Sequence, residues 1–462
     1  MRLHDTLTRE QRELRPIDGK SFRFYCCGPT VYGPAHIGNF RTFVLQDVLR
    51  RGLETGGIRT LHVRNVTDVD DKTIRDSQKA GLPLREFTAG WLERFHADCE
   101  ALNCLPPHIE PGAVDHIPQQ IEMIRTLVEK GHAYRSDDGS VYFRIASFAD
   151  YGKLSHLDTR ELSLGKTQAA RANADEYEKD SIADFVLWKA RRPEDGENHW
   201  GSPWGEGRPG WHLECSAMIR EYLGEEFDLH SGGVDLVFPH HENEIAQSRC
   251  ACGGHFAAHW FHITHLLVDG GKMSKSLGNL YTLDDLAARG FSPMELRYVL
   301  IGGHYRKPLN FTLDSLSAAR EALAKLARGA RALADRAGGG HVLADAGFGP
   351  FEAAWSALND DLNTPGALGG LFTGLREAAS LEGEEAARAL AGFNRLLRAL
   401  GLVLPEIDAE VEVPAEVRSL ADERWAARQA RDWAKSDEMR EQLAGLGWAV
   451  KDSKEGYELT PR

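Results

Sequence analysis

Apolar and polar residues alternate with the periods of strands and helices in the first 70 residues. Residues 21–27 are rich in aromatic side chains and end at a Gly-Pro pair, which predicts a short β-strand followed by a loop. The pattern over about residues 38–54 predicts a helix, and residues 60–66 predict the next strand. Strand, helix and strand make a βαβ unit, so we expect a parallel sheet with a right-handed crossover.

The middle of the chain changes character twice. Residues 85–132 look mostly helical, whereas residues 133–204 mix glycine, proline and charge and are interpreted as an irregular insertion. Residues 208–270 return to an α/β pattern, with a buried strand predicted at 262–268. We therefore predict an α/β fold in which a Rossmann-like parallel-sheet domain is split by an insertion.

A helical region and a small module complete the predicted fold. Leucine and alanine recur at spacings of three and four from Leu316 to Leu333, which predicts an amphipathic helix that Gly338 ends. A second helix is predicted to start at Asn363. The predicted segments are the Rossmann-like halves 1–115 and 205–285, the connecting insertion 116–204, a helical bundle 286–403 and a C-terminal module 404–462.

Composition and charge exclude several classes of protein. The 462 residues carry 55 Lys and Arg against 69 Asp and Glu, a net charge of −14, which excludes a polycation that holds nucleic acid by net charge alone. The chain has no apolar run of the ~18 residues that span a membrane. Its first residues have no apolar segment typical of a secretory signal, so we expect a cytoplasmic protein with no membrane partner. The seven cysteines are scattered and include no Cys-x-x-Cys, which argues against a disulfide framework.

Two glycine-containing segments each follow a predicted strand. In residues 28–39, Gly38 lets the backbone approach a ligand, and His36 can donate a hydrogen bond to a phosphate at a helix N-terminus. A plain turn with a capping His36 explains this segment equally well. In residues 270–279, Lys272 and Lys275 lie between glycines and can reach an anion, although a solvated basic turn has the same pattern.

Together these segments resemble a known family. His36-Ile-Gly-Asn39 and Lys272-Met-Ser-Lys-Ser276 resemble the two signature motifs of class I aminoacyl-tRNA synthetases. Three further segments, 63–72, 207–218 and 238–247, closely resemble the cysteinyl-tRNA synthetase family, and the resemblance covers nearly the whole chain. It implies an ATP-dependent cysteine–tRNA ligase that takes L-cysteine, ATP with Mg²⁺ and tRNA(Cys), and we expect it to be a monomer.

The resemblance assigns the nucleotide chemistry to five residues. His36, Asn39, Lys272 and Lys275 would be catalytic and would bind ATP together with Gly38. The family's first motif usually ends in histidine, and here it ends in Asn39. Asparagine can donate a hydrogen bond to a phosphate but carries no charge.

The resemblance also implies one zinc ion per chain, held by Cys27, Cys215, His240 and Glu244. The residue types support this, because thiolate, imidazole and carboxylate are good zinc ligands. His240 and Glu244 lie four residues apart, on one face of a helix that starts near Pro239. Two neighbours, Cys26 and His241, are expected to point elsewhere. Without the family match, a buried cysteine is more often only a small apolar residue. The His-His-Glu-Asn-Glu sequence does not match the His-Glu-x-x-His motif of metalloproteases.

A zinc ion would explain how cysteine is selected. Serine is nearly isosteric with cysteine, and an apolar pocket rejects such analogues weakly, whereas zinc prefers soft sulfur to a hydroxyl. The resemblance places Thr30, Trp211, His230 and Asp235 around the amino acid, with Asp235 at its ammonium group. Ordinary core packing remains the alternative for Trp211.

The C-terminal module resembles the family's anticodon-binding domain. Arg428, Asp437 and Asp452 would hydrogen-bond base edges, and Trp433 would stack on an unpaired base. A solvated helix with ion pairs four residues apart explains each residue as well. Because the whole chain is acidic, tRNA must meet a local basic face, which we expect around Arg297, Arg306 and Lys307.

Two rival functions remain on the sequence alone. The cysteine ligase of mycothiol biosynthesis would make the same adenylate with the same zinc and pass cysteine to an amino sugar, but it lacks a complete anticodon-binding module. A non-catalytic tRNA-binding paralogue would usually have lost a signature lysine or a metal ligand, and none is missing here.

Overall fold

The structure is a computed structural model that describes residues 1–157, 184–273, 278–338, 347–406, 413–453 and 456–461. It separates into two compact units, Met1–Leu404 and Pro405–Arg462. Each unit is described by itself. The five segment boundaries predicted from the sequence stay predictions. Among the described residues, no helix combines the length and the apolar character needed to cross a membrane.

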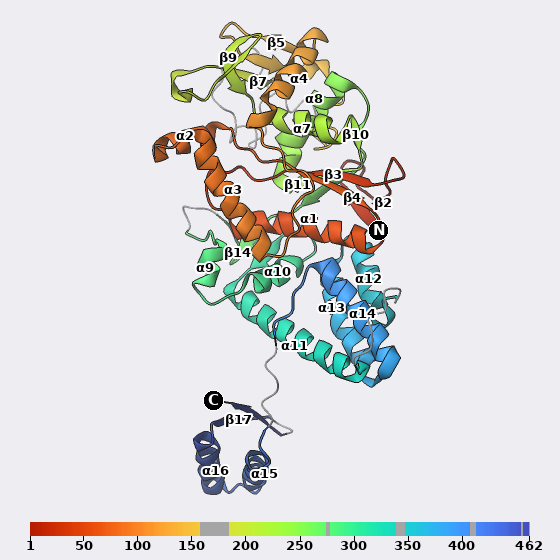
Figure 1. Cartoon of the computed structure of the whole chain (residues 1–462), viewed down its shortest axis with the longest axis vertical. Coiled ribbons are helices and arrows are strands. Elements are labelled where there is room, and N and C mark those ends of the chain that lie inside the picture. The colour runs from red at the N-terminus through yellow and green to blue at the C-terminus, as the bar shows by residue number, and fades with distance from the viewer. Residues whose placement is uncertain (158–183, 274–277, 339–346, 407–412, 454–455, 462) are drawn as a thin grey trace. The chain divides into compact units, whose positions relative to one another are not determined.

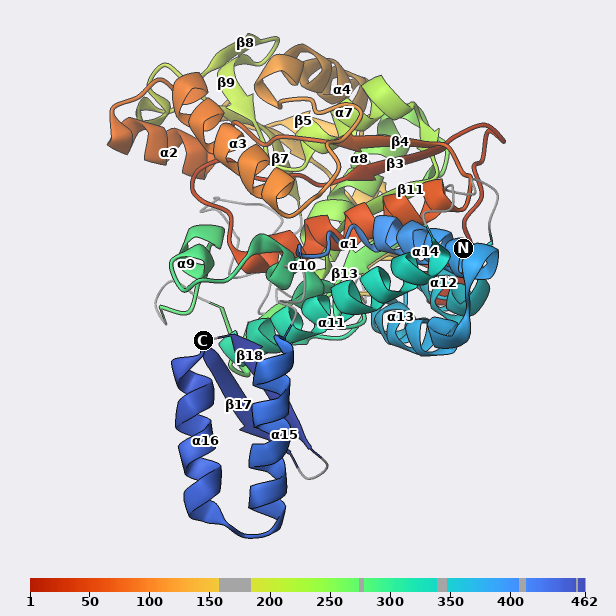
Figure 2. The ribbon, with the colours of Figure 1, turned by 60° about the horizontal axis from the view of Figure 1, so that its bottom comes forward.

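A parallel four-stranded sheet forms the centre of the first unit. Its strands, in spatial order, are β13 (Trp260–Ile263), β11 (Leu229–Gly233), β3 (Phe22–Cys26) and β4 (Thr60–Arg64). All three pairings are parallel. Helix α1 (Ile37–Thr55) connects β3 to β4 and lies along one face, with α7 (Leu213–Leu223) and α8 (Glu242–Cys252) on the other side (Figure 1, Figure 2). The predicted βαβ unit and α/β fold are confirmed.

The strands and α1 form because their apolar side chains fill one core. Phe24 of β3 and Phe40 and Val44 of α1 are fully buried in it. Burying one such side chain contributes about 1.5–3 kcal/mol. The Phe40 ring stacks on Phe95 of α3 (Leu84–Ala101) at a centroid distance of 6.1 Å, which holds α3 against α1. Helix α2 (Asp71–Ala80) precedes α3.

The inserted segment is more regular than the sequence suggests. It contains an antiparallel sheet in the order β5 (Ala133–Arg135), β6 (Val141–Phe143), β7 (Phe185–Ala190), β9 (Gly205–Pro209), β8 (Trp200–Ser202), preceded by α4 (Ile117–Glu129). The expectation of an irregular segment was wrong, because strands of three to six residues are too short to show a period. Strand β6 pairs with β7, which lies more than 40 residues later in the sequence.

The strand predicted at 262–268 is two strands in different sheets. Thr264 and His265 interrupt it, so that β13 ends at Ile263 and β14 runs over Leu266–Val268. Strand β14 pairs with β15 (Gly271–Lys272) and β16 (Leu309–Phe311). This unit also contains the strands β1 (Arg2–Asp5), β2 (Glu10–Glu13), β10 (Glu226–Phe227) and β12 (Phe256–Ala257).

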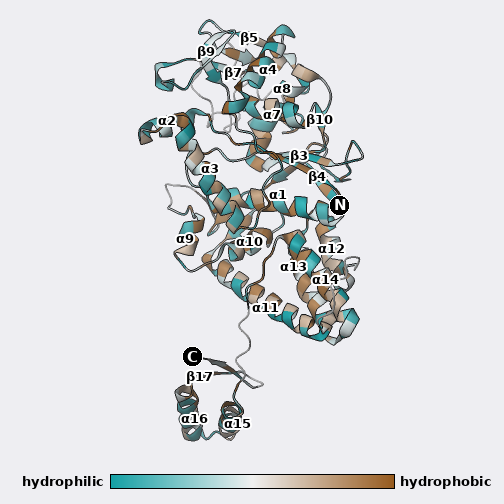
Figure 3. Ribbon diagram, viewed as in Figure 1, coloured by the Kyte–Doolittle hydropathy of each residue, from teal (hydrophilic) through white to brown (hydrophobic). Residues whose placement is uncertain are grey.

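Helices follow the sheet as predicted. They are α9 (Leu283–Ala287), α10 (Pro293–Ile301), α11 (Leu313–Ala337), α12 (Glu352–Asn359), α13 (Thr364–Glu377) and α14 (Gly383–Leu400). Helix α11 ends at Gly338, whose φ of 62° is the left-handed conformation that glycine tolerates, and α13 starts at its cap Asn363, so both predicted boundaries are confirmed. Figure 3 shows hydrophobic and hydrophilic residues interleaved along α11, as expected of a helix with one buried face.

The second unit is small. Helices α15 (Ala415–Gln429) and α16 (Trp433–Gly445) pack against the antiparallel pair β17 (Trp448–Asp452) and β18 (Tyr457–Pro461). Among its described residues, a cluster of five buried apolar side chains forms the core: Val417, Ala421, Leu443, Trp448 and Val450.

Candidate active site and metal centre

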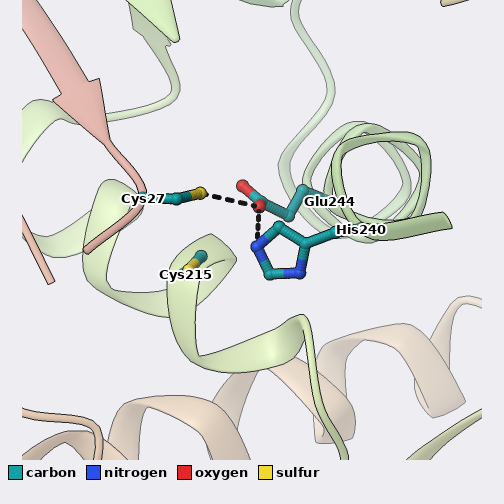
Figure 4. A group of neighbouring side chains, drawn as sticks. All are labelled: Cys27, Cys215, His240 and Glu244. Atoms are coloured by element: carbon teal, nitrogen blue, oxygen red, sulfur yellow. Dashed lines mark hydrogen bonds and ion pairs between the residues drawn. The ribbon is translucent and has the colours of Figure 1, made fainter. Parts of the chain in front are cut away.

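Four side chains from three parts of the chain meet beside the central sheet. Cys27 directly follows β3, Cys215 lies in the first turn of α7, and His240 and Glu244 come from the turn Val237–His241 and from α8 (Figure 4). One ligand atom of each lies within 4.8 Å of the others, and all four residues are buried. This group can hold a metal ion. The four residues that the sequence proposed as ligands are brought together.

Neighbouring side chains favour the ionised form of two of these ligands, Glu244 and Cys215, whereas burial raises the pKa of the Cys27 thiol. Glu244 Oε1 lies 2.8 Å from His240 Nε2. Burial alone would raise the pKa of Glu244, but the neighbouring His230 and His240 rings lower it to about 2. Burial also opposes the ionisation of Cys215, yet hydrogen bonding with Cys27 lowers its pKa to about 6. A carboxylate and a thiolate are the forms in which these side chains bind a cation.

Two histidines orient the ligands from outside the group. His212 Nδ1 lies 2.6 Å from His240 Nδ1, and His230 Nε2 lies 2.7 Å from Glu244 Oε2. Such outer contacts fix the orientation of metal ligands in proteins. His212 has a φ of 87°, a conformation that is strained for a residue with a Cβ. No role was predicted for His212, because its contact with a residue 28 positions away has no local signal in the sequence.

One neighbour of the ligands behaves differently from the prediction. His241 was expected to point elsewhere, but its Nε2 lies 3.3 Å from Cys27 Sγ. The expectation assumed a regular helix from Pro239, whereas Phe238 is extended, with φ −139° and ψ 133°, and α8 begins only at Glu242. In this irregular turn both consecutive histidines face the group. Cys26 is not part of it, and its burial raises the pKa of its thiol.

The four residues of the predicted amino-acid pocket have different surroundings in the structure. Trp211 is 40% exposed, and its ring centroid lies 5.2 Å from that of His240, so it is not core packing. His230 is buried on β11, in contact with Glu244. Thr30 forms an isolated bridge with Thr67. Asp235 lies exposed in the turn Val234–Leu236 after β11. Their roles toward an amino acid stay predictions.

The first signature motif forms a helix cap. His36 Nδ1 accepts a hydrogen bond from the Asn39 backbone N–H at 3.3 Å, and Asn39 Oδ1 accepts one from the His36 N–H at 3.0 Å. The N–H of Ile37 donates to the carbonyl of Tyr281 at 2.9 Å. The capping alternative is therefore present, and at least these two N–H groups of α1 already have partners. Because Nδ1 of His36 accepts, its ring proton is on Nε2, and the Asn39 side chain has an NH₂ group; both are donor groups of the kind that bind a phosphate.

The second signature motif lies mostly outside the described residues. The backbone of Lys272 belongs to β15, whereas Lys275 falls on residues 274–277, which are not described. Met273 is described, and its side chain packs against Gly38, where a Cβ atom would overlap the Met273 methyl group. The two motifs are thus in contact through Met273 and Gly38.

Two of the candidate anticodon residues, Arg428 and Asp452, form an ion pair in the second unit. Arg424 is buried and donates from Nη1 and Nη2 to the two oxygens of Asp452 at 2.7 and 2.8 Å. Arg428 Nη1 lies 3.4 Å from Asp452, and its guanidinium lies 5.5 Å from the ring centroid of Trp433. Trp433 is 54% exposed, as a stacking platform requires. Asp437 is on α16, and base contacts of all four predicted residues stay predictions.

Of the three residues predicted to form a basic face for tRNA, Arg297 was predicted wrongly. Arg297 is fully buried, with Nη2 2.5 Å from Asp47 Oδ2, and it donates to the carbonyls of Leu102 and Leu400. It cannot contact nucleic acid. Arg306 is paired with Asp361 at 2.5 Å but stays exposed, and Lys307 is exposed.

Comparisons with known proteins agree with this geometry. Residues 13–321 match the model of the class I (C) tRNA synthetase catalytic domain, residues 355–406 a DALR domain, and residues 410–458 the cysteinyl-tRNA ligase anticodon binding domain. The cysteine–tRNA ligase of Opitutus terrae is 57% identical over 467 residues, covering 100% of this chain and 99% of that protein. The chain belongs to the cysteinyl-tRNA synthetase family. The cysteine–tRNA ligase of Chlamydia muridarum is 43% identical, with 99% and 98% of the two chains covered.

Solved structures of other class I synthetases share the fold of this family member. A methionyl-tRNA synthetase of Mycobacterium tuberculosis in complex with methionyl-adenylate superposes with a TM-score of 0.58 at 16% identity, covering 82% of this chain and 89% of that one. A leucyl-tRNA synthetase complex from Agrobacterium radiobacter gives 0.59 at 12% identity, covering 82% and 83%. At such identities the likeness concerns the fold alone.

Proposed function

We propose that this chain ligates L-cysteine to the 3′-terminal ribose of tRNA(Cys) in two steps. The cysteine carboxylate first attacks the α-phosphate of ATP, forming cysteinyl-adenylate and releasing pyrophosphate. A ribose hydroxyl of the tRNA, for class I enzymes typically the 2′-OH, then attacks the adenylate carbonyl and releases AMP. The observation that carries the proposal is the buried group of Cys27, Cys215, His240 and Glu244, in a chain that also has a module matching the family's anticodon-binding domain. Neither rival function accounts for both features.

The first step needs charge stabilisation more than proton transfer. A carboxylate nucleophile is already ionised, so catalysis depends on positioning and on stabilising negative charge at the phosphates. His36 and Asn39 would donate to the phosphates from the cap of α1, with Gly38 leaving room for the nucleotide. Lys272 and Lys275 would neutralise charge from the other side, with Mg²⁺ as counter-ion to ATP.

The donor set of the buried group fits Zn²⁺. Two thiols, an imidazole and a carboxylate are ligands of the types and number found in tetrahedral zinc sites, and the ionised Glu244 has its opposite oxygen held by His230. When bound, zinc supplies a position that prefers the thiolate of cysteine to the hydroxyl of serine. His212 and His230 keep the ligands His240 and Glu244 in orientation for it.

The remaining pocket and tRNA roles follow the family. Thr30, Trp211, His230 and Asp235 would enclose the amino acid, with Asp235 beside the ammonium group. Arg428, Trp433, Asp437 and Asp452 would contact the anticodon. We further propose that the chain acts as a monomer in the cytoplasm.

Transfer of labelled cysteine separates the candidate functions. Purified chain receives ATP and radiolabelled cysteine, with tRNA in one reaction and glucosaminyl-inositol in the other, and bound metal is measured on the same sample. Label on tRNA, with about one zinc per chain, is expected. Label on the sugar alone would replace this function with the mycothiol reaction. No transfer despite bound zinc would favour a non-catalytic protein.

A further inference from the structure

A second group of potential ligands adjoins the first. Cys27, His230, His241 and Glu244 each offer one ligand atom, and these atoms lie within 4.8 Å of one another. All four residues are buried. Cys27 and Glu244 belong to both groups, so the two groups share one thiol and one carboxylate.

We propose that Cys27, His230, His241 and Glu244 form a second, weaker position for a divalent zinc-like cation, and that an ion there inhibits the enzyme by competing with cysteine. The metal-binding half of this proposal stands on the geometry of the group alone. The inhibition half rests on the proposed function, because only that function places His230 in the amino-acid pocket.

The shared residues can bridge two cations. Glu244 presents Oε1 to His240 at 2.8 Å and Oε2 to His230 at 2.7 Å, so each oxygen already faces a different group. A carboxylate placed in this way spans metal ions that are about 3.5–4 Å apart in two-metal sites. Cys27 Sγ lies 3.9 Å from Glu244 Oε1 on one side and 3.3 Å from His241 Nε2 on the other. Sulfur and nitrogen ligands of one tetrahedral zinc ion are separated by about 3.6 Å, close to the second distance.

His241, one of the two ligands that belong only to the second group, is oriented by an outer chain of contacts. His241 Nδ1 lies 2.7 Å from His262 Nε2, and His262 Nδ1 lies 2.7 Å from Thr6 Oγ1. Metal-bound histidines regularly have such a partner at the second ring nitrogen. The contact with His262 leaves Nε2 of His241 directed at Cys27.

The ionised ligands leave a negative charge after the first cation has bound, and geometry makes a second cation the more weakly bound one. One divalent ion held by two thiolates and one carboxylate leaves a net charge of 2 − 3 = −1 in a buried group, and a second divalent ion changes this to +1. The second ion must also separate His230 from Glu244, because nitrogen and oxygen ligands of one tetrahedral ion are about 3.4 Å apart rather than the 2.7 Å in this structure. The first position therefore fills first.

Equilibrium dialysis against Zn²⁺ tests the metal-binding half on the full chain. We expect the unchanged protein to bind one ion tightly and a second weakly. His241→Asn should keep the tight ion, which also reports an intact fold, and lose the second. His262→Ala should weaken only the second ion, by about 10–100-fold, the usual effect of removing an outer partner. Cys250→Ser, a buried thiol outside both groups, is the matched control and should bind both ions.

Ion counts can exclude the second metal position without any bearing on the proposed function. Saturation of the unchanged protein at one ion, or a second ion that survives His241→Asn, would contradict the second position. Loss of both ions in His241→Asn would also contradict it. These ion counts do not depend on which reaction the chain catalyses.

Pyrophosphate exchange then tests the inhibition half. Zinc in excess of one ion per chain should inhibit cysteine-dependent exchange, and a higher cysteine concentration should relieve this inhibition. In His241→Asn, excess zinc should not lower the exchange rate below the rate that this variant has with one zinc ion per chain. Inhibition of equal strength in both proteins would show that the second ion does not act through this position.

Discussion

The side chain of Met273 packs on Gly38, so the two signature motifs touch where α1 begins. A Cβ atom at position 38 would overlap the Met273 methyl group and would lie 3.2 Å from two ring atoms of His36. Gly38→Ala should therefore displace Met273 and slow cysteinyl-adenylate formation by ten-fold or more, because a small misplacement of catalytic groups costs this much or more in rate. ATP–pyrophosphate exchange measures it.

A double variant separates two causes of that loss. If the overlap with Met273 is responsible, Gly38→Ala with Met273→Ala should recover much of the rate lost in Gly38→Ala alone. If the new methyl group instead blocks the nucleotide, the second substitution will not help and the KM for ATP will stay high. The second outcome would argue that the Met273–Gly38 contact has no part in the reaction.

Cys215 should be essential for the tight metal ion. Cys215→Ser replaces a thiol by a hydroxyl, a much poorer ligand for a soft or borderline cation, so we expect loss of most of the bound zinc and a raised KM for cysteine. Metal analysis after dialysis measures the first effect. Cys250→Ser is the matched control, a buried thiol that belongs to neither ligand group, and should retain its zinc. Full metal retention with a normal KM for cysteine in Cys215→Ser would remove Cys215 from the site.

Arg297 should matter for stability and Lys307 for nucleic acid. Arg297→Met leaves the buried Asp47 carboxylate with one cation fewer, since Arg51 is then its only ion-pair partner among the described residues. This change should lower the free energy of unfolding by about 3–5 kcal/mol in urea titrations. Lys307 is exposed, so Lys307→Met should change it by less than about 0.5 kcal/mol. The same Lys307 variant should reduce the salt dependence of tRNA binding by about one unit of slope. Equal unfolding free energies for both variants would contradict the burial argument.

Asp5 links the N-terminal strand pair to β13, and its contribution should depend on pH. Its Oδ1 accepts a hydrogen bond from the Trp260 N–H at 2.9 Å, and its Oδ2 accepts one from the Thr8 hydroxyl at 2.8 Å. Burial alone would raise the pKa of Asp5, but the charge on His259 and these hydrogen bonds lower it below its usual value. A lowered pKa in the folded state adds stability above the unfolded pKa of about 3.9, and this stability is lost as the pH falls through the folded value.

Asp5→Asn should therefore destabilise the chain at pH 7 by about 1.5–3 kcal/mol, the usual range for hydrogen bonds to a charged group. The difference from the unchanged protein should shrink below about pH 4. Urea unfolding at pH 7, 5 and 3.5 measures it. A difference that stays constant over this range would mean that the ionised form of Asp5 is not what stabilises the fold.

The sequence was sufficient wherever a local pattern determines the structure. The strand before Cys27, the helix after His36 and the caps at Gly338 and Asn363 all depend on residues within a few positions, and all four are confirmed. The insertion was misjudged because its strands are short and pair with distant partners.

The metal ligands needed the family resemblance, because Cys27 and Cys215 are 188 positions apart and share no period. The errors in the site arose in the same way. The orientation of His241 was misjudged because it lies in an irregular turn that helical spacing does not describe. His212 was missed because its ring contacts a residue 28 positions away. Arg297 looked like an exposed cation because its partner Asp47 lies 250 residues earlier. Local patterns specify elements, but they do not specify which side chains meet.

We propose that a metal ion held by Cys27, Cys215, His240 and Glu244 selects cysteine. The most direct measurement is the kcat/KM for cysteine relative to serine in ATP–pyrophosphate exchange, determined on one preparation before zinc removal, after it, and after zinc is restored. We expect strong preference for cysteine with zinc bound, loss of cysteine activation without it, and recovery when zinc returns. Unchanged selectivity in the zinc-free chain would contradict the role of the metal ion.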